Sequence, residues 1–346
     1  MRMSAENNRF LHRFACFTAA ATLLLICSGG MVTSKGVGLA VPDWPTTFGY
    51  NMFFFPVSKW VGGIFFEHTH RLIASIIGFL TIILAVWLWR APVARWIKRL
   101  GWASLGAVVL QGVLGGLRVT LLKDQIGIVH ACLAQAFFGL LVIIALATSP
   151  LWRRLARPVA TFPPRSLALL AMVITGIIYG QLGLGATMRH QHRDLAIMDF
   201  PLAYGQIIPA TDSATIARVN QAREAQALSE VSAGQIWLQM AHRFVAALIF
   251  CGVVGYWWAL RATSDNSPRT LRVLSDLWVI CVVSQIGLGA WTIWSNKAAD
   301  IATAHVAVGA LTFATGIAIC AVLLRLRRRT QQPVDRVAHL AGAIAT

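Results

Sequence analysis

The chain has 346 residues, of which 57% are hydrophobic and only 12% are charged. A soluble domain carries roughly a quarter charged residues, so this composition argues against a soluble protein and favours one whose surface faces lipid. The net charge of +17 is high enough to suggest nucleic acid as a partner. However, the basic residues are spread over alternate connections between apolar segments, which argues against a nucleic-acid-binding face.

Eight apolar segments of about 20 residues, the length that crosses a bilayer core, follow one another along the chain. They are Phe14–Val32, Leu72–Trp89, Gly101–Val119, Gly127–Thr148, Leu167–Thr187, Trp237–Leu260, Leu274–Trp294 and Ile301–Leu324. The sequence therefore predicts an all-α integral membrane protein with eight transmembrane helices. The first segment follows a basic start but lacks a small-residue cleavage site, so we interpret it as a helix and not as a signal peptide.

Lys and Arg cluster before the first segment, after the second, fourth and sixth segments, and after the eighth. By the positive-inside rule, both termini and these connections are predicted to be cytoplasmic, and the other loops to lie outside. No transit peptide is apparent, and the compact N-terminus favours a bacterial inner membrane over a mitochondrial one. All six cysteines fall inside the predicted spans, where we interpret them as small buried hydrophobic residues.

The two halves of the chain resemble each other. The matching elements are Leu39–Pro45 with Leu195–Pro201, His70-Arg71 with His242-Arg243, Gln111–Gly116 with Gln285–Ala290, and His130 with His305. The offset between the copies grows from 156 to 172 residues, which places an insertion in the second outer loop, where a helical stretch is expected near 212–229. Fixed-offset similarity of this kind indicates an internal duplication.

Each copy contains four spans, an even number, so the two copies cross the membrane in the same direction. We therefore predict a parallel repeat of two four-helix bundles. The predicted units are an N-terminal bundle at 1–158, a C-terminal bundle at 159–330 and a cytoplasmic tail at 331–346.

Four histidines, His70, His130, His242 and His305, each fall near the outer start of an even-numbered span. Within each copy, the second and fourth spans run in parallel, and facing helices of a bundle would direct their two imidazoles at each other. A single histidine of this kind is commonly an interfacial residue or a helix–helix contact. The repetition of the pair, with separations of 60 and 63 residues, instead favours two bis-histidine haem sites over zinc or copper sites.

Both copies place an arginine directly after the first histidine of the pair, as Arg71 and Arg243. A guanidinium suits a haem propionate because it matches a carboxylate bidentately. Only the first copy adds a carboxylate, Glu67, on the same helix face as His70 and Arg71. Glu67 is either an ion-pair partner of Arg71 or a proton-handling group beside a reacting haem.

Other residues carry weaker predictions. The two Asp-aromatic-Pro elements, at 43–45 and 199–201, are either ordinary turns or lids over the haem pockets. His68 is expected to face away from His70. His190 and His192 lie in the second outer loop, where they are either solvated or involved in metal delivery.

Glu67-x-x-His70-Arg71, His130, His242-Arg243 and His305, in eight spans forming two halves, resemble the pattern of the haem A synthase family over nearly the whole chain. This resemblance implies an oxidoreductase that oxidises the C8 methyl group of haem O to a formyl group, giving haem A for the assembly of haem–copper oxidases. It also implies haem O as substrate, haem b as cofactor, and haem O synthase and cytochrome oxidase assembly factors as candidate partners.

Carried over by position, the resemblance makes Glu67 the catalytic residue. His70, His130 and Arg71 would bind the substrate haem, with His70 and His130 as the ligands of its iron. His242 and His305 would ligate the iron of haem b. One branch of the family has a cysteine pair in an outer loop. This chain has none there and resembles the branch without that pair, found in proteobacteria and mitochondria.

Two other functions compete with this one. A dihaem cytochrome b that transfers electrons between quinol and a partner would explain all four histidines, but both haems would then be permanent. A transporter would also have parallel repeats, but its binding site would lie at the membrane midplane, whereas the ionisable residues here lie near the outer surface.

Overall fold

The computed structural model describes residues 5–155, 164–191, 195–262 and 268–327. His192 and the predicted tail at 331–346 lie outside the described residues.

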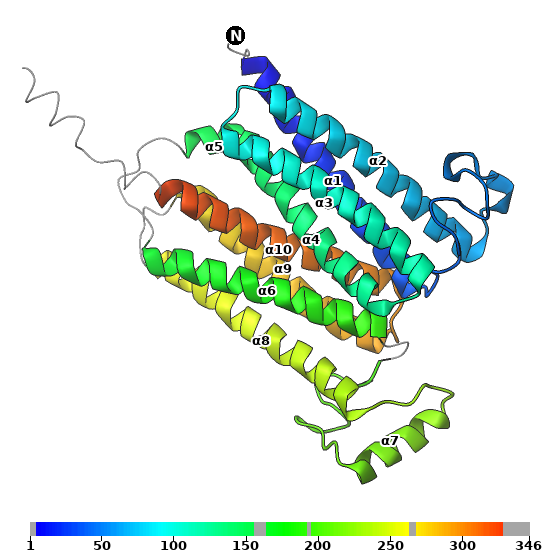
Figure 1. The fold of residues 1–346 in the computed structure, drawn as a ribbon. Coiled ribbons are helices and arrows are strands. Elements are labelled where there is room, and N and C mark those ends of the chain that lie inside the picture. The colour runs from blue at the N-terminus through cyan, green and yellow to red at the C-terminus, as the bar shows by residue number, and fades with distance from the viewer. Residues whose placement is uncertain (1–4, 156–163, 192–194, 263–267, 328–346) are drawn as a thin grey trace, which may run out of the picture.

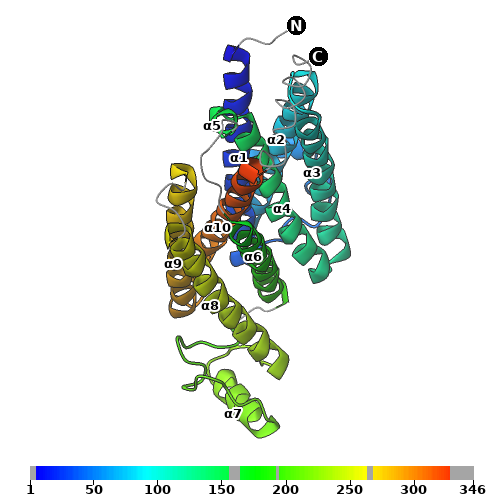
Figure 2. The ribbon, with the colours of Figure 1, turned by 90° about the vertical axis from the view of Figure 1, so that its left-hand side faces the viewer.

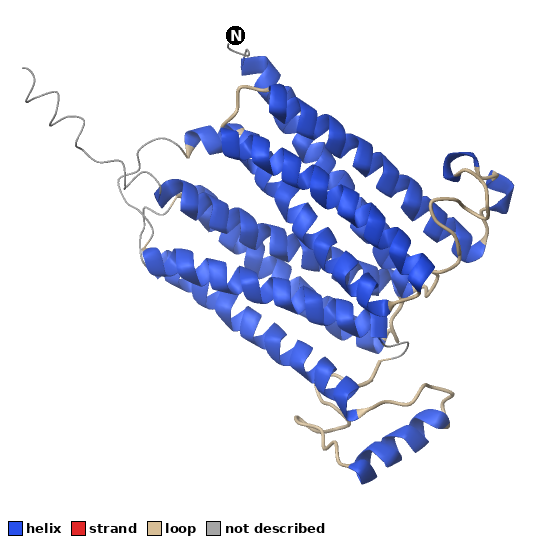
Figure 3. Ribbon diagram, in the orientation of Figure 1, coloured by secondary structure: helices blue, strands red, loops and turns tan. Residues whose placement is uncertain are grey.

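The described part of the chain is helical, without β-strands (Figures 1 and 3). The helices are α1 (Ala5–Ser34), η1 (Met52–Phe54), η2 (Val57–Lys59), α2 (Gly62–Arg90), α3 (Arg95–Leu121), α4 (Asp124–Thr148), α5 (Pro150–Arg154), α6 (Arg165–Gln191), α7 (Ser213–Glu224), α8 (Ala233–Ala262), α9 (Arg269–Trp294) and α10 (Ala299–Arg327). Eight of them, all except η1, η2, α5 and α7, are long and apolar enough to cross a membrane. Each contains one predicted span, so the all-α class with eight membrane-spanning helices is confirmed.

Prolines set several helix boundaries. α2 ends just before Pro92, whose ring disfavours helical backbone at the residue before it. Pro150 occupies the first turn of α5, where its missing N–H costs nothing, and the hydroxyl of Ser149 caps this helix by accepting from the Trp152 N–H at 3.0 Å. Pro268 likewise precedes the first residue of α9.

Each half of the chain has the same order of neighbouring helices. In the first half, α1 and α3 each pack against both α2 and α4, so α2 and α4 lie on opposite corners. In the second half, α6 and α9 each pack against both α8 and α10, which leaves α8 and α10 opposite. Figure 2 shows the two halves side by side. The parallel-repeat relation and the unit boundaries remain predictions.

The halves meet through α1 with α10, α4 with α6, and α4 with α10. Each half has its own cluster of buried apolar side chains, but Ala310 and Ala314 of α10 belong to the cluster of the first half. Small residues at these positions let the helix backbones approach closely. Membrane helices rely on such close packing because lipid supplies no hydrophobic driving force between helices. α10 has more buried residues in its apolar stretch than any other span of the described chain.

The two loops that the sequence predicts to be outer loops project from the end of the molecule opposite the N-terminus (Figure 1). The first joins α1 to α2 and contains η1 and η2, whereas the second joins α6 to α8 and contains α7. α7 lies where the sequence predicted an inserted helix. Asp212 caps it by accepting a hydrogen bond from the Thr215 N–H at 3.0 Å.

Candidate functional site

The first Asp-aromatic-Pro element forms a tight turn around Asp43. The carboxylate of Asp43 accepts hydrogen bonds from the backbone N–H of Phe48 at 2.7 Å and of Gly49 at 2.9 Å, and from the hydroxyl of Thr46 at 2.5 Å. Partial burial alone would raise the pKa of Asp43, but these hydrogen bonds hold that pKa below its usual value. Gly49 has φ +77°, a conformation that glycine adopts without a steric penalty.

The second element repeats this turn 156 residues later. Asp199 accepts from the backbone N–H of Tyr204 at 2.8 Å and of Gly205 at 2.9 Å. Gly205 again has positive φ, and the peptide bond before the proline is cis in both turns. Two loops with the same hydrogen bonds at equivalent residues are what the sequence match at 39–45 and 195–201 led us to expect.

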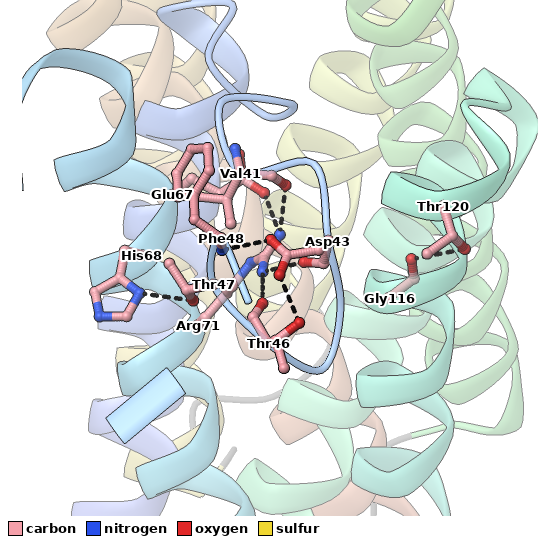
Figure 4. A network of polar contacts seen from close by, with 10 residues as sticks. All are labelled: Val41, Asp43, Thr46, Thr47, Phe48, Glu67, His68, Arg71, Gly116 and Thr120. Carbon is pink, nitrogen blue, oxygen red and sulfur yellow. Dashed lines mark hydrogen bonds and ion pairs between the residues drawn. The ribbon is translucent and has the colours of Figure 1, made fainter. Parts of the chain in front are cut away.

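Arg71 anchors the first turn onto α2 (Figure 4). One terminal nitrogen of its guanidinium donates to the carbonyls of Asp43 at 2.7 Å and Thr46 at 3.1 Å. The other donates to the carbonyl of Val41 at 2.9 Å and to Glu67 Oε1 at 2.7 Å. Of the two alternatives for Glu67, the ion pair with Arg71 is therefore present, and both terminal nitrogens of Arg71 are occupied by the protein itself.

Arg243 anchors the second turn in the same way but less completely. Its terminal nitrogens donate to the carbonyls of Asp199 at 2.6 Å and Leu202 at 2.8 Å. The Nε of Arg243 is buried and has no hydrogen-bond partner among the described residues. A buried donor without a partner is costly, so a ligand oxygen at this position would be favourable.

Glu67 and Gln239 occupy equivalent positions and make equivalent contacts. Oε2 of Glu67 accepts a hydrogen bond from the Val41 N–H at 3.0 Å, and Oε1 of Gln239 accepts one from the Ile197 N–H at 2.9 Å. Gln239 Nε2 also donates to the Ile197 carbonyl at 2.9 Å. Both side chains are buried and hold the outer loop against the helix. The difference between the halves at this position is therefore the negative charge of Glu67.

His68 packs beneath the first outer loop. It is fully buried, its Nδ1 lies 3.3 Å from the hydroxyl of Thr47, and its ring centre lies 5.1 Å from that of Phe55 and 4.7 Å from that of Trp60. In the second half, the residue at this position is Met240, which belongs to a small apolar cluster. His68 is thus a loop-packing residue.

His242 and His305 face each other across the second half. Their ring centres are 6.5 Å apart with an interplanar angle of 60°. Two imidazoles that bind one metal ion from opposite sides, with metal–nitrogen bonds of about 2 Å, have ring centres roughly 6 to 6.5 Å apart. The spacing therefore fits a six-coordinate haem iron held between these two histidines.

The four histidines His70, His130, His242 and His305 are alike in their hydrogen bonding. The Nδ1 atom of each is buried and has no hydrogen-bond partner among the described residues. Each imidazole also faces a glycine of a neighbouring helix. A Cβ atom built on the glycine would lie 3.0 to 3.4 Å from the histidine Cε1. The pairs are Gly29 with His70, Gly115 with His130, Gly185 with His242, and Gly289 with His305.

Two of these glycines, Gly29 and Gly185, were not identified from the sequence. They are 156 residues apart, the same offset that relates the outer loops, so the duplication itself was the signal that could have found them. Gly115 and Gly289 lie in the matching segments Gln111–Gly116 and Gln285–Ala290 that the sequence comparison identified. Their lack of a side chain leaves room for the imidazoles of His130 and His305 to pack against them.

Trp44 of the first turn lies against α3. A Cβ atom on Gly116 would be only 2.3 Å from the Trp44 ring, so glycine at this position is what admits the indole. Gly116 adjoins Gly115, which faces His130. The first outer loop is therefore seated beside the first histidine pair.

The remaining candidates have structural contacts. The Nδ1 of His12 lies 3.0 Å from the Ala145 carbonyl and links α1 to α4. All six cysteines are free and lie in helices, but only Cys281 is buried, and Cys16 and Cys251 are exposed, so the interpretation of all six as buried residues was wrong. Within the described ranges, no group of three or more His, Cys, Asp or Glu side chains is arranged to hold a metal ion.

Comparison with known proteins gives consistent results. The family described as COX15-CtaA, cytochrome oxidase assembly protein, matches residues 12–317. A heme A synthase of Halalkalibacterium halodurans is 26% identical, over 93% of this chain and 98% of that protein. One from Geobacillus kaustophilus is 28% identical over 97% of this chain and 98% of its own length. One from Hyphomonas neptunium is 25% identical over 71% of this chain and 67% of its own length.

Proposed function

The chain belongs to the COX15-CtaA family of cytochrome oxidase assembly proteins, and we propose that its first histidine pair binds a substrate haem while its second pair holds a permanent haem b. Its activity is that of a haem A synthase, an oxidoreductase that converts haem O into haem A by oxidising the C8 methyl group of the porphyrin to a formyl group. The reaction takes place in a membrane, which suits a lipophilic substrate.

The facing imidazoles of His242 and His305 are the single observation that carries the assignment of the permanent haem. Their 6.5 Å separation fits one haem iron, and no carboxylate stands at the position of Glu67 in this half. When bound, haem b supplies an electron carrier. Arg243, whose Nε lacks a protein partner, is our candidate for a propionate of this haem.

The first pair is proposed to bind haem O because the first half has a carboxylate, Glu67, where the second half has Gln239. His70 and His130 extend from opposite corners of their four helices, and each has a glycine beside its ring. Oxidation of a methyl group releases protons, and Glu67 is one turn from His70 on the same helix. A buried carboxylate at this place could accept such a proton, which makes Glu67 the catalytic candidate.

Arg71 contributes to substrate binding indirectly, by holding the first turn in place. Three of its hydrogen bonds, to the carbonyls of Val41, Asp43 and Thr46, fix the turn that carries Trp44. Trp44 packs against Gly116 of α3, next to Gly115, which faces His130. We propose that this turn is a lid over the substrate site. Such a lid would exclude water from the reacting methyl group, where preorganised protein groups act most strongly.

We further propose that the membrane is a bacterial inner membrane, with both termini in the cytoplasm. The basic connections after the second, fourth and sixth spans support this orientation. Haem O synthase and cytochrome oxidase assembly factors are the proposed protein partners. The first outer loop contains no cysteine, so we place the chain in the branch that lacks a loop cysteine pair.

Haem content tests how the two pairs divide their roles. The chain should be purified from cells that make haem B but not haem O, and its haem measured by absorbance and extraction. We expect one haem b in the unaltered chain, loss of it in His242→Ala and in His305→Ala, and retention in His70→Ala and in the control His12→Ala. Loss of the resident haem in His70→Ala alone would reverse the assignment, and two resident haems would favour a dihaem cytochrome b.

A further inference from the structure

Two basic side chains from different halves of the molecule meet at one glycine of α4. Arg118 lies in the last turn of α3 and His190 in the last turn of α6. A Cβ atom built on Gly127 would lie 2.7 Å from Nδ1 of His190 and 3.1 Å from Nε of Arg118. Both side chains therefore occupy the space in front of this glycine. The first outer loop covers the guanidinium from the other side, since a Cβ on Gly38 would lie 3.0 Å from both of its terminal nitrogens.

This basic pair lies one turn outward from the first histidine pair. Arg118 follows Gly115 by three residues on α3, and Gly127 precedes His130 by three residues on α4. Residues three apart share a helix face and are separated by about 4.5 Å along the axis. Arg118 is also near enough to His70 and His130 for its charge to act on both of them.

The side chain of Arg118 has no hydrogen-bond or ion-pair partner within bonding distance among the described residues. Glu67 and Asp124 affect it only through longer-range electrostatics. Its half-buried guanidinium offers five donors in a fixed plane, and none of them is taken up by a described residue. Arg118 thus differs from Arg71, whose terminal nitrogens already make four hydrogen bonds to the protein.

The second half has no such arginine. The residue equivalent to Arg118, at the offset of 174, is Thr292, whose hydroxyl donates to the Leu288 carbonyl of its own helix at 2.8 Å. Arg189, whose charge acts on His305, is already bonded to the carbonyl of Gly30 and the hydroxyl of Ser34. Arg243 of the second half has an unpartnered Nε, but both of its terminal nitrogens are bonded to the protein. Arg118 therefore differs from both arginines because none of its side-chain nitrogens is bonded to a described residue.

We propose that Arg118 and His190 form a carboxylate-binding site at the outer edge of the first histidine pair, and that it takes a propionate of the substrate haem. The inference rests on the proposed function, because it assumes that His70 and His130 bind that haem. Arg118 supplies the bidentate, charge-assisted contact that a carboxylate favours, and His190 supplies a further donor. The site is only partly buried, which suits a substrate that must enter and leave. The sequence placed His190 in the second outer loop, either solvated or involved in metal delivery, but it lies in the last turn of α6 and contributes to this site.

The test compares haem O with its dimethyl ester, in which both propionates are blocked. Each is titrated into the detergent-solubilised full chain, with its resident haem in place, and binding is followed by absorbance. The unaltered chain should bind the free acid about tenfold to a hundredfold more tightly than the ester. Arg118→Gln should lose most of this preference, Arg118→Lys should keep part of it, and His190→Gln should show a smaller loss.

Gly38→Ala tests the same site without removing a charge, because a Cβ atom there would lie only 3.0 Å from both terminal nitrogens of Arg118 and would push the guanidinium out of its present position by a few tenths of an ångström. It should weaken binding of the free acid and leave binding of the ester unchanged. The control Arg218→Gln removes an exposed arginine of α7 and should change neither titration. An undiminished preference for the free acid in Arg118→Gln and in Gly38→Ala would overturn the proposal.

His70→Ala separates this inference from the assignment on which it rests. His70→Ala should abolish binding of both haem O and its dimethyl ester at the substrate-haem site. If both still bound normally, the substrate assignment would be wrong. A preference that then still depended on Arg118 would nevertheless support the carboxylate site.

Discussion

Glu67 and Gln239 show how one position can keep its structural role while its charge differs between the halves. Each holds an outer loop by accepting a backbone N–H, at 3.0 Å from Val41 and at 2.9 Å from Ile197. Because glutamine already performs this anchoring in the second half, Glu67→Gln should preserve the loop and remove only the carboxylate. Glu67→Ala should remove both, at a cost in stability of about 1–3 kcal/mol for the unsatisfied partners.

The first prediction concerns catalysis by Glu67. We expect Glu67→Gln to bind haem like the unaltered chain but to form haem A at least about a hundredfold more slowly, because general acid–base catalysis contributes about 10²–10⁴-fold. The measurement is the rate of haem A formation per bound haem. Gln239→Ala, which loosens the second loop without touching the first, is the matched control. Full activity in Glu67→Gln would reduce Glu67 to a loop anchor.

The second prediction concerns the pH dependence of the first turn. The pKa of Asp43 in the folded protein is lower than that of an unfolded carboxyl, about 3.9. Ionised Asp43 therefore stabilises the turn fully above about pH 4, and this contribution is lost as the pH falls through the lower, folded-state value. Hydrogen exchange at the amides of Phe48 and Gly49 should stay slow from neutral pH down to about pH 4 and accelerate, relative to the intrinsic rate, below it.

Asp43→Asn should remove this acid transition while leaving some protection, because the amide oxygen can still accept a hydrogen bond. An acid transition that persisted unchanged in Asp43→Asn would show that another group controls the turn.

At the scale of single residues, the sequence predicted contacts within a helix turn better than contacts between segments. The Glu67–Arg71 ion pair followed from its spacing, and it is present. Bonds from Arg71 to carbonyls of the outer loop could not be predicted, because they depend on how the loop returns to α2. For the same reason, the sequence suggested a propionate for Arg71, whereas its terminal nitrogens are taken up by the turn.

At the scale of helices, the third prediction tests the glycines that face the histidines. A Cβ on Gly289 would lie 3.2 Å from Cε1 of His305, whereas a Cβ on Gly287, in the same helix, would have no atom within 4 Å. Gly289→Ala should therefore shift the imidazole and lower the content of resident haem, and Gly287→Ala should not. The measurement is haem per protein after purification. Equal haem content in the two variants would show that the imidazole tolerates the added methyl group.

Helix boundaries were predictable where apolar residues continue to the helix end and less so where polar residues begin the helix. The second apolar run was placed from Leu72, but α2 begins at Gly62. Glu67, His68 and Arg71 interrupt the apolar pattern, yet they lie within the helix and make hydrogen bonds to the outer loop. A helical stretch was expected near 212–229 in the second loop, and α7 lies there, capped by the hydrogen bond from the Thr215 N–H to Asp212.

At the scale of the whole molecule, the fourth prediction tests the orientation in the membrane. Ile207 is 78% exposed in the second outer loop, whereas Arg154 lies at the opposite end, in α5. An impermeant thiol reagent applied to intact cells should label Ile207→Cys, and should label Arg154→Cys only after the membrane is opened. The unaltered chain, whose six cysteines lie in helices, is the background control. Labelling of Arg154→Cys in intact cells would invert the proposed topology.

The eight spans could be predicted because each is a long apolar run, and the duplication could be predicted because motifs recur at similar offsets. The order of neighbouring helices could not be obtained in this way. Contacts such as α1 with α10 and α4 with α6 depend on which small residues meet across the two halves. The Arg118–His190 site lies at that junction and joins residues 72 positions apart in the sequence, so no local pattern announces it.

The most direct test of the account is to express the chain in cells that make haem O but not haem A, and to separate the extracted haems by chromatography. We predict haem A, or its hydroxylated precursor, with the unaltered chain and with the control His12→Ala. Neither product should appear with His70→Ala or His305→Ala. Unchanged haem O with the intact chain, together with two haem b molecules per purified protein, would contradict the account and indicate an electron-transferring cytochrome.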